Sequence, residues 1–447
     1  MYDTQIVIVG AGPTGLTLGI ELARRSIASR LIDAAAGPLP GSRGKGIQPR
    51  TLEVFEDLGV LAAILEAGTP YPNVRVHLGP FTLRLGPLGG RKQATELVPY
   101  PNLWLVPQYR TEEILRERLA QLGGQVEFGV AFEGMATGER GVQVHFSSGE
   151  SVTAEYLVGC DGGHSAVRRA LGLALRGETL DPESAFVADV KVEELGHTNW
   201  HVWPFARRDS LGLCPLPEPS LFQMMSPREP AQGIEVAIQR VSGCHVAQIV
   251  WSSMYRPSVR MVDHLRVGRT FLAGDAAHLH PPTGGQGLNT GVQDAYNLGW
   301  KLAHVLRGGP DSLLDTYESE RLPVAAAVLG LSKQIYRTRS LKRGEATNQL
   351  RLHYRGSALS SGNPLGRLHP GDRMPDLRLT DGTRLFEQMR GTHATEFITK
   401  DGIRILIRPD GYIASIGKQP VAAFAGVPTH RVNGSGTDFE SLIGGGS

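Results

Sequence analysis

The glycine-rich segment near the N-terminus limits the fold more than any other feature of the sequence. A short β-branched run, residues 5–9, leads directly into Gly10-Ala-Gly12-Pro13-Thr14-Gly15, and a helical pattern follows. In this spacing Gly10 permits a tight turn, Gly12 lets the backbone approach a pyrophosphate, and Gly15 lets the helix pack on the strand. Asp33 ends the next apolar run, where its carboxylate can accept hydrogen bonds from ribose hydroxyls. The chain is therefore predicted to begin with a βαβ unit that binds a dinucleotide.

Two later segments repeat the pattern of a strand that ends in an acid beside glycines. In the first, an apolar run from Tyr156 ends at Asp161-Gly-Gly, which by itself is an ordinary strand end. In the second, Gly274-Asp275 follows an apolar run, and a loop dense in glycine, residues 281–289, leads into an apolar helical pattern. Such a loop lets backbone N–H groups approach a planar ligand, and the helix dipole stabilises negative charge on that ligand. The three segments together are shaped to hold FAD.

The spacing of patterns between these segments predicts an α/β fold. It combines a Rossmann-like FAD-binding domain, an inserted and mainly antiparallel β-sheet, and a small C-terminal domain. Strand-like runs fill residues 182–256: AFVADVKVE, NWHVWPFA, LGLCPLP, LFQMMS, EVAIQRV and HVAQIVWSS. Helices are expected over residues 50–65 and over 111–122, the second with Thr111 as its N-cap.

The predicted boundaries divide the chain into five parts. Residues 1–181 form the first part of the FAD-binding domain and contribute strands near 71–107 to the inserted sheet. Residues 182–256 form that sheet, which would bind the substrate. Residues 257–340 return to the FAD-binding domain and its following helix, 341–371 form a linker, and 372–447 form the C-terminal α/β unit.

Composition excludes several classes of protein. The formal net charge of +2 over 447 residues gives no electrostatic footprint for nucleic acid. No apolar run approaches the ~20 residues that span a bilayer, so no membrane contact is expected. The three cysteines lie far apart, which indicates a reduced, cytoplasmic setting. His278 and His280 lack a matching cysteine or carboxylate cluster, so no metal site is expected.

In order and spacing, these segments resemble the flavoprotein monooxygenases of the p-hydroxybenzoate hydroxylase type. The similarity is greatest to the subgroup that acts on phenols and polyketides, including that subgroup's thioredoxin-like C-terminal domain. The resemblance spans residues 1 to about 340 and implies a role for each matching residue. Gly10, Gly12, Pro13, Thr14 and Gly15 would hold the FAD pyrophosphate, and Asp33, where Glu is commoner, the adenosine ribose. Flavin, ribityl or phosphate contacts would come from Arg43, Gln108, Asp161, Asp275, Pro282, Gly285, Gly287, Leu288 and Asn289.

The resemblance also implies a reaction. NADPH or NADH would reduce the flavin, O2 would form a flavin C4a-hydroperoxide, and an electron-rich aromatic ring would be hydroxylated. The residue that activates the substrate stays open, with His201, Tyr255 and Arg256 as candidates in or beside the inserted sheet. Trp200, Trp203, Phe205 and Phe222 would either line an aromatic site or form ordinary sheet core. The C-terminal unit contains no cysteine, so a structural or subunit-contact role is expected, in a monomer or homodimer.

Three alternative functions share the FAD-binding fold. A flavin-dependent halogenase is disfavoured because Trp200-His-Val-Trp203-Pro204 lacks the spacing of the halogenase tryptophan motif. A flavin-dependent reductase that saturates isoprenoid chains would favour a more apolar groove and membrane contact. A non-catalytic FAD-binding protein is the remaining alternative, although the glycine-rich loop is intact.

Overall fold

An eight-stranded sheet carries the glycine-rich turn. The structure, a computed structural model, describes residues 2–138, 141–181, 184–204, 210–281, 284–338, 345–417, 424 and 426–433. The sheet's main path runs β19-β20-β11-β1-β2-β8, and β9 and β10 extend it from β11. Its strands are β1 (Thr4–Val9), β2 (Ser29–Asp33), β8 (Val126–Phe128), β9 (Phe132–Thr137), β10 (Val142–Phe146), β11 (Ser151–Gly159), β19 (Arg266–Val267) and β20 (Thr270–Leu272). Strand β1 pairs in parallel with both β2 and β11, so the turn after β1 lies among three strand ends.

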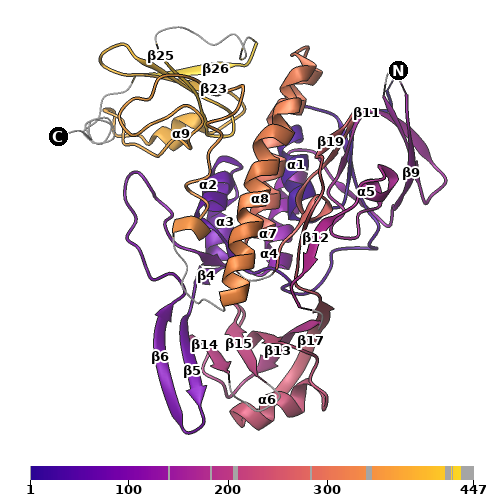
Figure 1. Cartoon of the computed structure of the whole chain (residues 1–447), viewed down its shortest axis with the longest axis vertical. Coiled ribbons are helices and arrows are strands. Elements are labelled where there is room, and N and C mark those ends of the chain that lie inside the picture. The colour runs from indigo at the N-terminus through magenta and orange to yellow at the C-terminus, as the bar shows by residue number, and fades with distance from the viewer. Residues whose placement is uncertain are drawn as a thin grey trace.

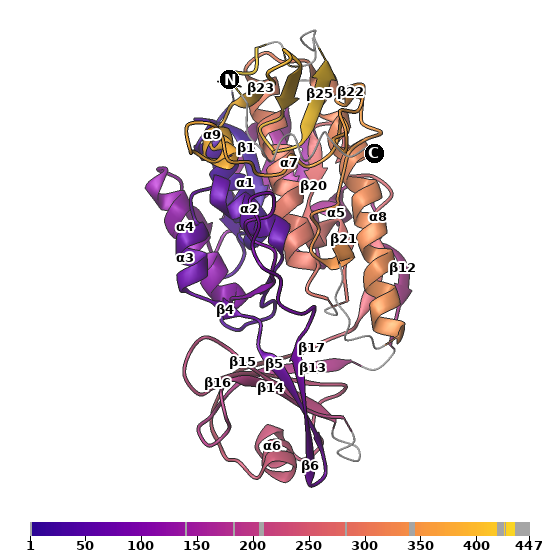
Figure 2. The same ribbon diagram turned by 90° about the vertical axis from the view of Figure 1, so that its left-hand side faces the viewer.

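Helices cover this sheet and connect it to the rest of the molecule (Figures 1 and 2). They are α1 (Pro13–Ala23), α2 (Pro49–Asp57), α3 (Leu61–Glu66), α4 (Gln108–Gln121), α5 (Ala166–Ala170), α7 (Gly287–Leu306) and α8 (Asp315–Thr338). Two predicted helix boundaries were wrong. The helix expected over 50–65 is broken because Gly59 adopts a φ of +76°, which ends α2. Helix α4 begins at Gln108, so Thr111 lies inside its first turn rather than at its N-cap.

A seven-stranded sheet, here called the lower sheet, lies at the bottom of Figure 1. Its order is β17-β13-β16-β15-β14-β5-β6, and β5 and β6 come from the region near residue 80. The strands are β5 (Asn73–Leu78), β6 (Phe81–Pro87), β13 (Ala185–Val192), β14 (Asn199–Trp203), β15 (Leu211–Pro215), β16 (Leu221–Ser226) and β17 (Val246–Tyr255). Most pairs are antiparallel, whereas β14 and β5 run parallel.

The EVAIQRV segment is a helix, so the prediction that it forms a strand was wrong. It makes up most of α6 (Ile234–Ser242), which lies beneath the lower sheet in both ribbon views (Figures 1 and 2). Gly233 and Gly243 flank the helix with φ of +88° and +75°. Ile234, Ala237 and Ile238 are buried at helical spacing, and they pack with Phe222 and other core residues of the sheet.

The lower sheet therefore has two different faces. On the α6 face, alternate residues such as Val190, Phe222 and Met224 form an apolar core. Because side chains alternate along a strand, their neighbours point to the opposite, upper face. Asp189 and Gln223 on that upper face both hydrogen-bond to Ser42 of the FAD-binding part. The upper face thus meets the segment that follows β2.

Two small three-stranded sheets join the two larger sheets. One contains β12 (Arg176–Thr179), β18 (Ser258–Met261) and β21 (His278–Leu279), and the other β3 (Gly46–Ile47), β4 (Thr69–Pro70) and β7 (Trp104–Leu105). Among the described residues, no helix is long and apolar enough to cross a membrane.

The C-terminal unit contains a five-stranded sheet in the order β22-β25-β24-β23-β26. Its elements are β22 (Ser361–Gly362), α9 (Leu385–Met389), β23 (Ala394–Ile398), β24 (Arg404–Ile407), β25 (Ile413–Gly417) and β26 (Thr429–Asn433). Residues 345–371, expected as a linker, include β22 and pack closely. Gln349 is 2% exposed and Tyr354 is 4% exposed, because their polar atoms bond to side chains of α7 and α8.

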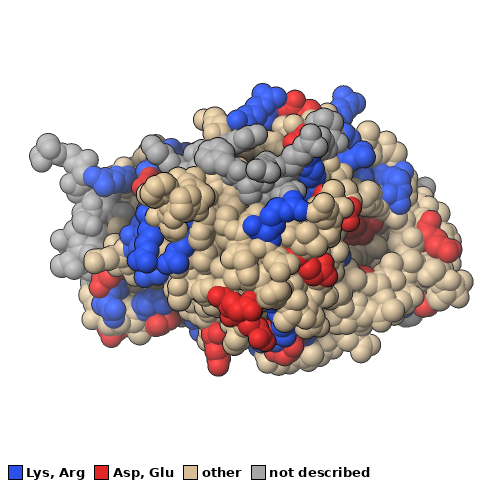
Figure 3. Space-filling view, turned by 90° about the horizontal axis from the view of Figure 1, so that it is seen from below, with Lys and Arg blue, Asp and Glu red and all other residues tan. Residues whose placement is uncertain are grey.

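Charge on the underside of the molecule is mixed in sign. Seen from below, Lys and Arg side chains lie interspersed with Asp and Glu side chains over the visible, described surface (Figure 3). A nucleic-acid-binding face would instead gather positive charge.

Candidate FAD and substrate site

The glycine turn after β1 has two glycines that the fold requires and one that it does not. A Cβ on Gly10 would lie 2.5 Å from the carbonyl oxygen of Cys160, and a Cβ on Gly15 would lie 1.9 Å from that of Gly10. A Cβ on Gly12 would meet nothing within 4 Å, and Gly12 has an ordinary φ of −71°. Helix α1 begins at Pro13 without a side-chain cap, so its N-terminal N–H groups are available to an anion. The open space at Gly12 fits a pyrophosphate group.

Asp33 lies beside this turn at the end of β2. Its Oδ2 accepts a hydrogen bond from the N–H of Ala11 at 2.7 Å, and its Oδ1 accepts one from Ala35 at 2.9 Å. The carboxylate therefore supports the turn and keeps further lone pairs for a ribose hydroxyl.

Asp161 lies at the end of β11 and stabilises the N-terminus of α5. Its Oδ2 accepts hydrogen bonds from the N–H groups of Ala166 and Val167 at 2.6 and 3.2 Å. Its Oδ1 is buried and has no partner among the described residues. A buried acceptor without a donor is destabilising, so this oxygen fits a hydroxyl group supplied by a ligand.

The third glycine-rich segment, which begins at Gly274, packs against the turn formed by Gly10–Gly15. After β20, the short 3-10 helix η1 (Gly274–Ala276) contains Asp275, whose side chain is exposed. Cβ atoms on Gly274 or Gly291 would lie 2.6 or 2.4 Å from Oγ1 of Thr14, so η1 and α7 pack directly against this side chain of α1 and leave no room for a side chain at either glycine. A Cβ on Gly287 would lie 3.6 Å from Oδ1 of Asp275, which places this carboxylate at the N-terminus of α7.

Asn289 ties the glycine-rich loop to the segment around Gly46. Its Oδ1 accepts from the N–H of Gln48 at 2.8 Å. Its Nδ2 donates to the carbonyl oxygens of Gly46 and Gly285 at 2.8 and 2.7 Å. The Gly44 N–H donates to Oε1 of Gln108, the first residue of α4, at 3.1 Å. Segments far apart in the sequence thus form one surface, which also includes Leu288, 3.5 Å from a Cβ built on Gly44.

Arg43, another predicted FAD contact, lies near the lower sheet. Arg43 is exposed, and its guanidinium carbon lies 5.8 Å from the ring centre of Trp251 on β17. Pro282 lies outside the described residues, as does Phe205 of the candidate aromatic group.

A buried acid that the sequence analysis missed connects these segments. Asp294 of α7 accepts hydrogen bonds from the N–H of Gly274 at 3.1 Å and from Nε of Arg321 at 2.7 Å, and bonds to Nε2 of His278 at 2.7 Å. Burial alone would raise the pKa of Asp294, but Arg321 and His278 lower it to about 2. Only the position of Asp294 inside the apolar helical pattern of α7 marked it as unusual in the sequence.

His278 extends this network toward the glycine-rich loop. Its Nδ1 lies 3.0 Å from Nε2 of His280, whose own Nδ1 is buried and without a partner among the described residues. Burial, with the nearby His278, lowers the pKa of His280 well below its usual value. His280 is therefore neutral at neutral pH.

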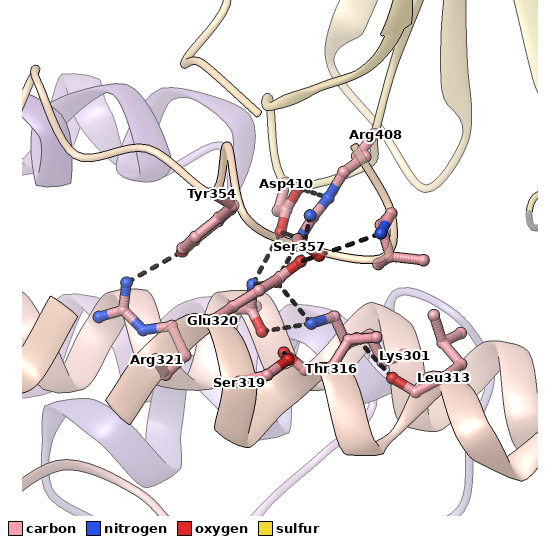
Figure 4. A network of polar contacts seen from close by, with 12 residues as sticks. Lys301, Leu313, Thr316, Ser319, Glu320, Arg321, Tyr354, Ser357, Arg408 and Asp410 are labelled. Carbon is pink, nitrogen blue, oxygen red and sulfur yellow. Dashed lines mark hydrogen bonds and ion pairs between the residues drawn. The ribbon is translucent and has the colours of Figure 1, made fainter. Parts of the chain in front are cut away.

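A second buried network joins the FAD-binding helices to the C-terminal unit (Figure 4). Glu320 of α8 accepts hydrogen bonds from Arg408 of the C-terminal unit at 2.6 and 2.9 Å and from Lys301 of α7 at 2.7 Å. Arg408 also pairs with Asp410, and all four side chains are buried. The adjacent Arg321 reaches Asp294, so both networks meet on α8.

The candidate substrate-activating residues fall in three different places. His201 is 2% exposed, and its Nε2 bonds to the carbonyl oxygen of Gly196 at 2.8 Å. Its ring stacks with those of His77 and Trp203, and Trp203 belongs to the α6-face core. This placement puts His201 on the α6 face of the lower sheet, opposite the upper face that meets Ser42. Arg256 is exposed, and its Nε lies 3.4 Å from Oγ of Ser184.

Tyr255 ends β17 on the upper face of the lower sheet. It pairs with Ala185, and Trp251 pairs with Asp189 in the same register. Burial, together with nearby Tyr336, raises the pKa of Tyr255 to about 12, so its phenol is protonated at neutral pH.

The aromatic residues of the lower sheet divide between its two faces. Phe222 and Trp203 lie in the α6-face core, so both are ordinary sheet core. Trp200 alternates with His201 and is half-buried on the upper face, packed against Leu105, Cys214 and their neighbours.

These segments define an α/β protein whose three strand ends and second sheet enclose a surface suited to a dinucleotide. Comparisons with known proteins agree. The chain is 43% identical to a flavin-dependent monooxygenase of Mycobacteroides abscessus, over 91% of this chain and 96% of that protein. It is 34% identical to a rifampicin monooxygenase of Streptomyces venezuelae, over 94% and 96% of the two chains. The structure of the OxyS anhydrotetracycline hydroxylase from Streptomyces rimosus matches with a TM-score of 0.74 and 30% identity, over 93% and 95%.

The family follows from these similarities. The chain belongs to the FAD binding domain family, which matches residues 3–332. It is an FAD-dependent monooxygenase.

Proposed function

We propose that this monooxygenase hydroxylates a phenolic or polyketide-type aromatic small molecule, with O2 as co-substrate and NADPH or NADH as electron donor. One observation carries the proposal: the upper face of the lower sheet is joined to the flavin segments through Ser42. The N–H and Oγ of Ser42 donate to Asp189 at 2.7 and 2.5 Å, and both side chains are buried. A substrate between the sheet and the flavin would be enclosed and shielded from water.

The chemical character of the upper face favours an aromatic substrate. Trp200, Trp251 and Tyr255 lie on it, together with Cys214 and Met225. Aromatic and thioether side chains pack well against a planar ring. The rifampicin and anhydrotetracycline enzymes named above act on such molecules, which supports extending that substrate class to this chain.

The proposed FAD contacts follow the geometry. Gly12 and the N-terminus of α1 would hold the pyrophosphate, and Asp33 the adenosine ribose. Asp161 and Asp275 would hold other hydroxyls of the cofactor, while the surface formed by Gly44, Gln108 and residues 285–289 would lie against the flavin ring. Bound FAD supplies the redox chemistry, and the chain's residues position the ring and exclude water.

We also propose that the C-terminal unit is thioredoxin-like, supported by its parallel β23–β26 pair beside the antiparallel β23–β24–β25 meander. Its role would be structural, because all three cysteines lie elsewhere in the sequence.

NAD(P)H oxidation by the yellow, FAD-loaded protein in air tests the substrate class. A phenol, naphthol or aromatic polyketide should accelerate oxidation and gain one oxygen atom from isotopically labelled O2. If no member of a broad panel does so, the proposed substrate class is wrong. Oxidation that yields only peroxide would point to an unproductive fit of the substrate rather than to loss of FAD.

A further inference from the structure

Lys45 is a buried cation between the flavin segments and the lower sheet. Its side chain is 9% exposed, and Nζ donates to Oε1 of Gln223 on β16. Nζ also lies 3.8 Å from Sδ of Met225 and 5.1 Å from the ring centre of Trp200. All three neighbours belong to the upper face. The lysine reaches that face from a backbone segment that contacts the glycine-rich loop.

No carboxylate within the described residues pairs with Lys45 at 4 Å or less. The carboxylate of Asp189 interacts electrostatically with Lys45, but it already accepts two hydrogen bonds from Ser42. Burial raises the pKa of Asp189, while the hydrogen bonds from Ser42 and the charge of Lys45 act in the opposite direction. Burial also raises the pKa of the nearby Cys214 thiol, which is therefore neutral. A buried ammonium group without a carboxylate in direct contact is destabilising. A negatively charged group bound beside Lys45 would therefore stabilise it.

A second donor on the same face also lacks a partner. Nε1 of Trp200 is buried and makes no hydrogen bond within the described residues. It would lie 3.0 Å from a Cβ built on Gly212, so this glycine leaves room for the indole on the upper face. An oxygen atom bound beside Lys45 and Trp200 would supply an acceptor to the indole N–H and a second acceptor to the ammonium group, which already donates to Gln223.

The backbone places this cation next to the flavin segments. Gly46, which follows Lys45, accepts from Nδ2 of Asn289 in the glycine-rich loop, and Gly44, which precedes it, bonds to Gln108. A group bound at Lys45 would thus lie between the lower sheet and the surface proposed for the flavin ring.

We propose that Lys45 binds the ionised oxygen of the substrate, a phenolate or enolate, and so orients the ring and keeps it electron-rich. This inference rests on the proposed function, because it assigns the substrate's acidic oxygen to a point in the same site. On binding, the phenol O–H releases its proton to solvent and the anion pairs with the ammonium group. A positive charge within about 4–6 Å of an acidic group lowers the pKa of that group by about 1–3 units.

A chromogenic phenol tests the assignment without turnover. The probe is 4-nitrophenol, added to the FAD-loaded protein and titrated with pH while the phenolate absorbance is followed. The wild type should lower the pKa of the bound probe by about 1–3 units relative to free probe. Lys45→Met, which keeps length but removes charge, should abolish this shift, and Lys45→Arg should restore most of it. Lys92→Met, at an exposed loop position, is the matched control and should behave as wild type.

The outcomes separate this inference from the proposed function. An unshifted probe in the wild type, or an equal shift in Lys45→Met, overturns the role of Lys45. A Lys45→Met protein that loses FAD or melts earlier, yet shifts the probe normally, also overturns it and leaves Lys45 as a structural link. A lost shift in Lys45→Met with unchanged FAD content supports the role. If the wild type shifts the probe but hydroxylates no phenol, the anion site stands and the proposed function fails.

Discussion

Nε of Arg321 on α8 donates a hydrogen bond to Oδ1 of Asp294 on α7 at 2.7 Å, with both side chains buried. The other carboxylate oxygen accepts from the N–H of Gly274, in the segment proposed to contact the cofactor. One ion pair between helices therefore fixes part of the segment proposed to contact the flavin cofactor. Its disruption should affect both stability and FAD retention.

The first prediction concerns the substitution Asp294→Asn. Removal of the charge leaves Arg321 buried without its counterion, which costs about 3–5 kcal/mol in free energy of unfolding. Denaturant unfolding should show this loss, and FAD content should fall. Asp315→Asn is the control, because Asp315 is 71% exposed in its ion pair with Arg266 and such surface pairs contribute about 0–1 kcal/mol. Equal stability of the two variants would contradict the assigned role.

The second prediction concerns acid stability. In the folded protein the pKa of Asp294 is about 2, below the ~3.9 of an unfolded aspartate. The unfolded state therefore binds the proton first, and the stabilisation from this group is lost as pH falls from about 4 to about 2. The unfolding free energy, measured across this range, should fall less steeply in Asp294→Asn than in the wild type. Identical slopes would mean that folding does not lower the pKa of Asp294.

The third prediction compares two members of the buried network in Figure 4. Glu320→Gln leaves Lys301 and Arg408 with only Asp410 as a buried counterion, so it should cost about 3–5 kcal/mol. Lys301→Met should cost less, because Arg408 still neutralises Glu320 and burial already lowers the pKa of Lys301 to about 8. Melting temperatures of the two variants check the order, and the reverse order would refute it.

The fourth prediction separates folding from cofactor binding at the glycine turn. Gly15→Ala forces a Cβ to within 1.9 Å of the carbonyl oxygen of Gly10, so this variant should not fold stably. Gly12→Ala meets nothing within 4 Å in the protein alone, so it should fold normally but exclude the pyrophosphate. Circular dichroism and FAD content distinguish the two effects. A Gly12→Ala protein that remains fully yellow would show that the phosphates bind elsewhere.

The fifth prediction concerns Asn289. Its side chain makes three hydrogen bonds, two of which join the glycine-rich loop to Gly46 and Gln48 while the third, to Gly285, lies within the loop. At about 0.5–1.5 kcal/mol each, their loss in Asn289→Ala should weaken FAD binding by at least about tenfold. Fluorescence titration with FAD measures the change. Asn102→Ala, on an exposed loop contact with Lys92, should bind FAD as the wild type does.

The sequence predicted those parts of the site that depend on neighbouring residues. The Gly10–Gly15 turn and the strand-end acids are local patterns, because one strand and the following helix determine their geometry. Asp294 and Arg321 could not be paired from the sequence, since their partners come from α7, α8 and η1 and meet only in the tertiary fold. Lys45 was passed over for the same reason: its neighbours Trp200 and Gln223 lie on strands far along the chain.

The helix α6 shows why pattern alone misassigned one element. Val236, Ile238 and Val241 are β-branched residues typical of a strand, yet Ile234, Ala237 and Ile238 also match a helical stripe. The seven strands of the lower sheet come from other segments of the chain. The EVAIQRV segment forms a helix that covers the apolar face of this sheet.

Arg408 has a consequence for how the whole chain unfolds. Its guanidinium is 0% exposed and is bound to Glu320 of α8, so separation of the C-terminal sheet would break this buried ion pair and leave Arg408 with Asp410 and Glu320 with Lys301. The two parts should therefore melt in a single transition. A protease that cuts between the two parts should release no stable FAD-binding core. The C-terminal unit would thus be needed to stabilise helices α7 and α8.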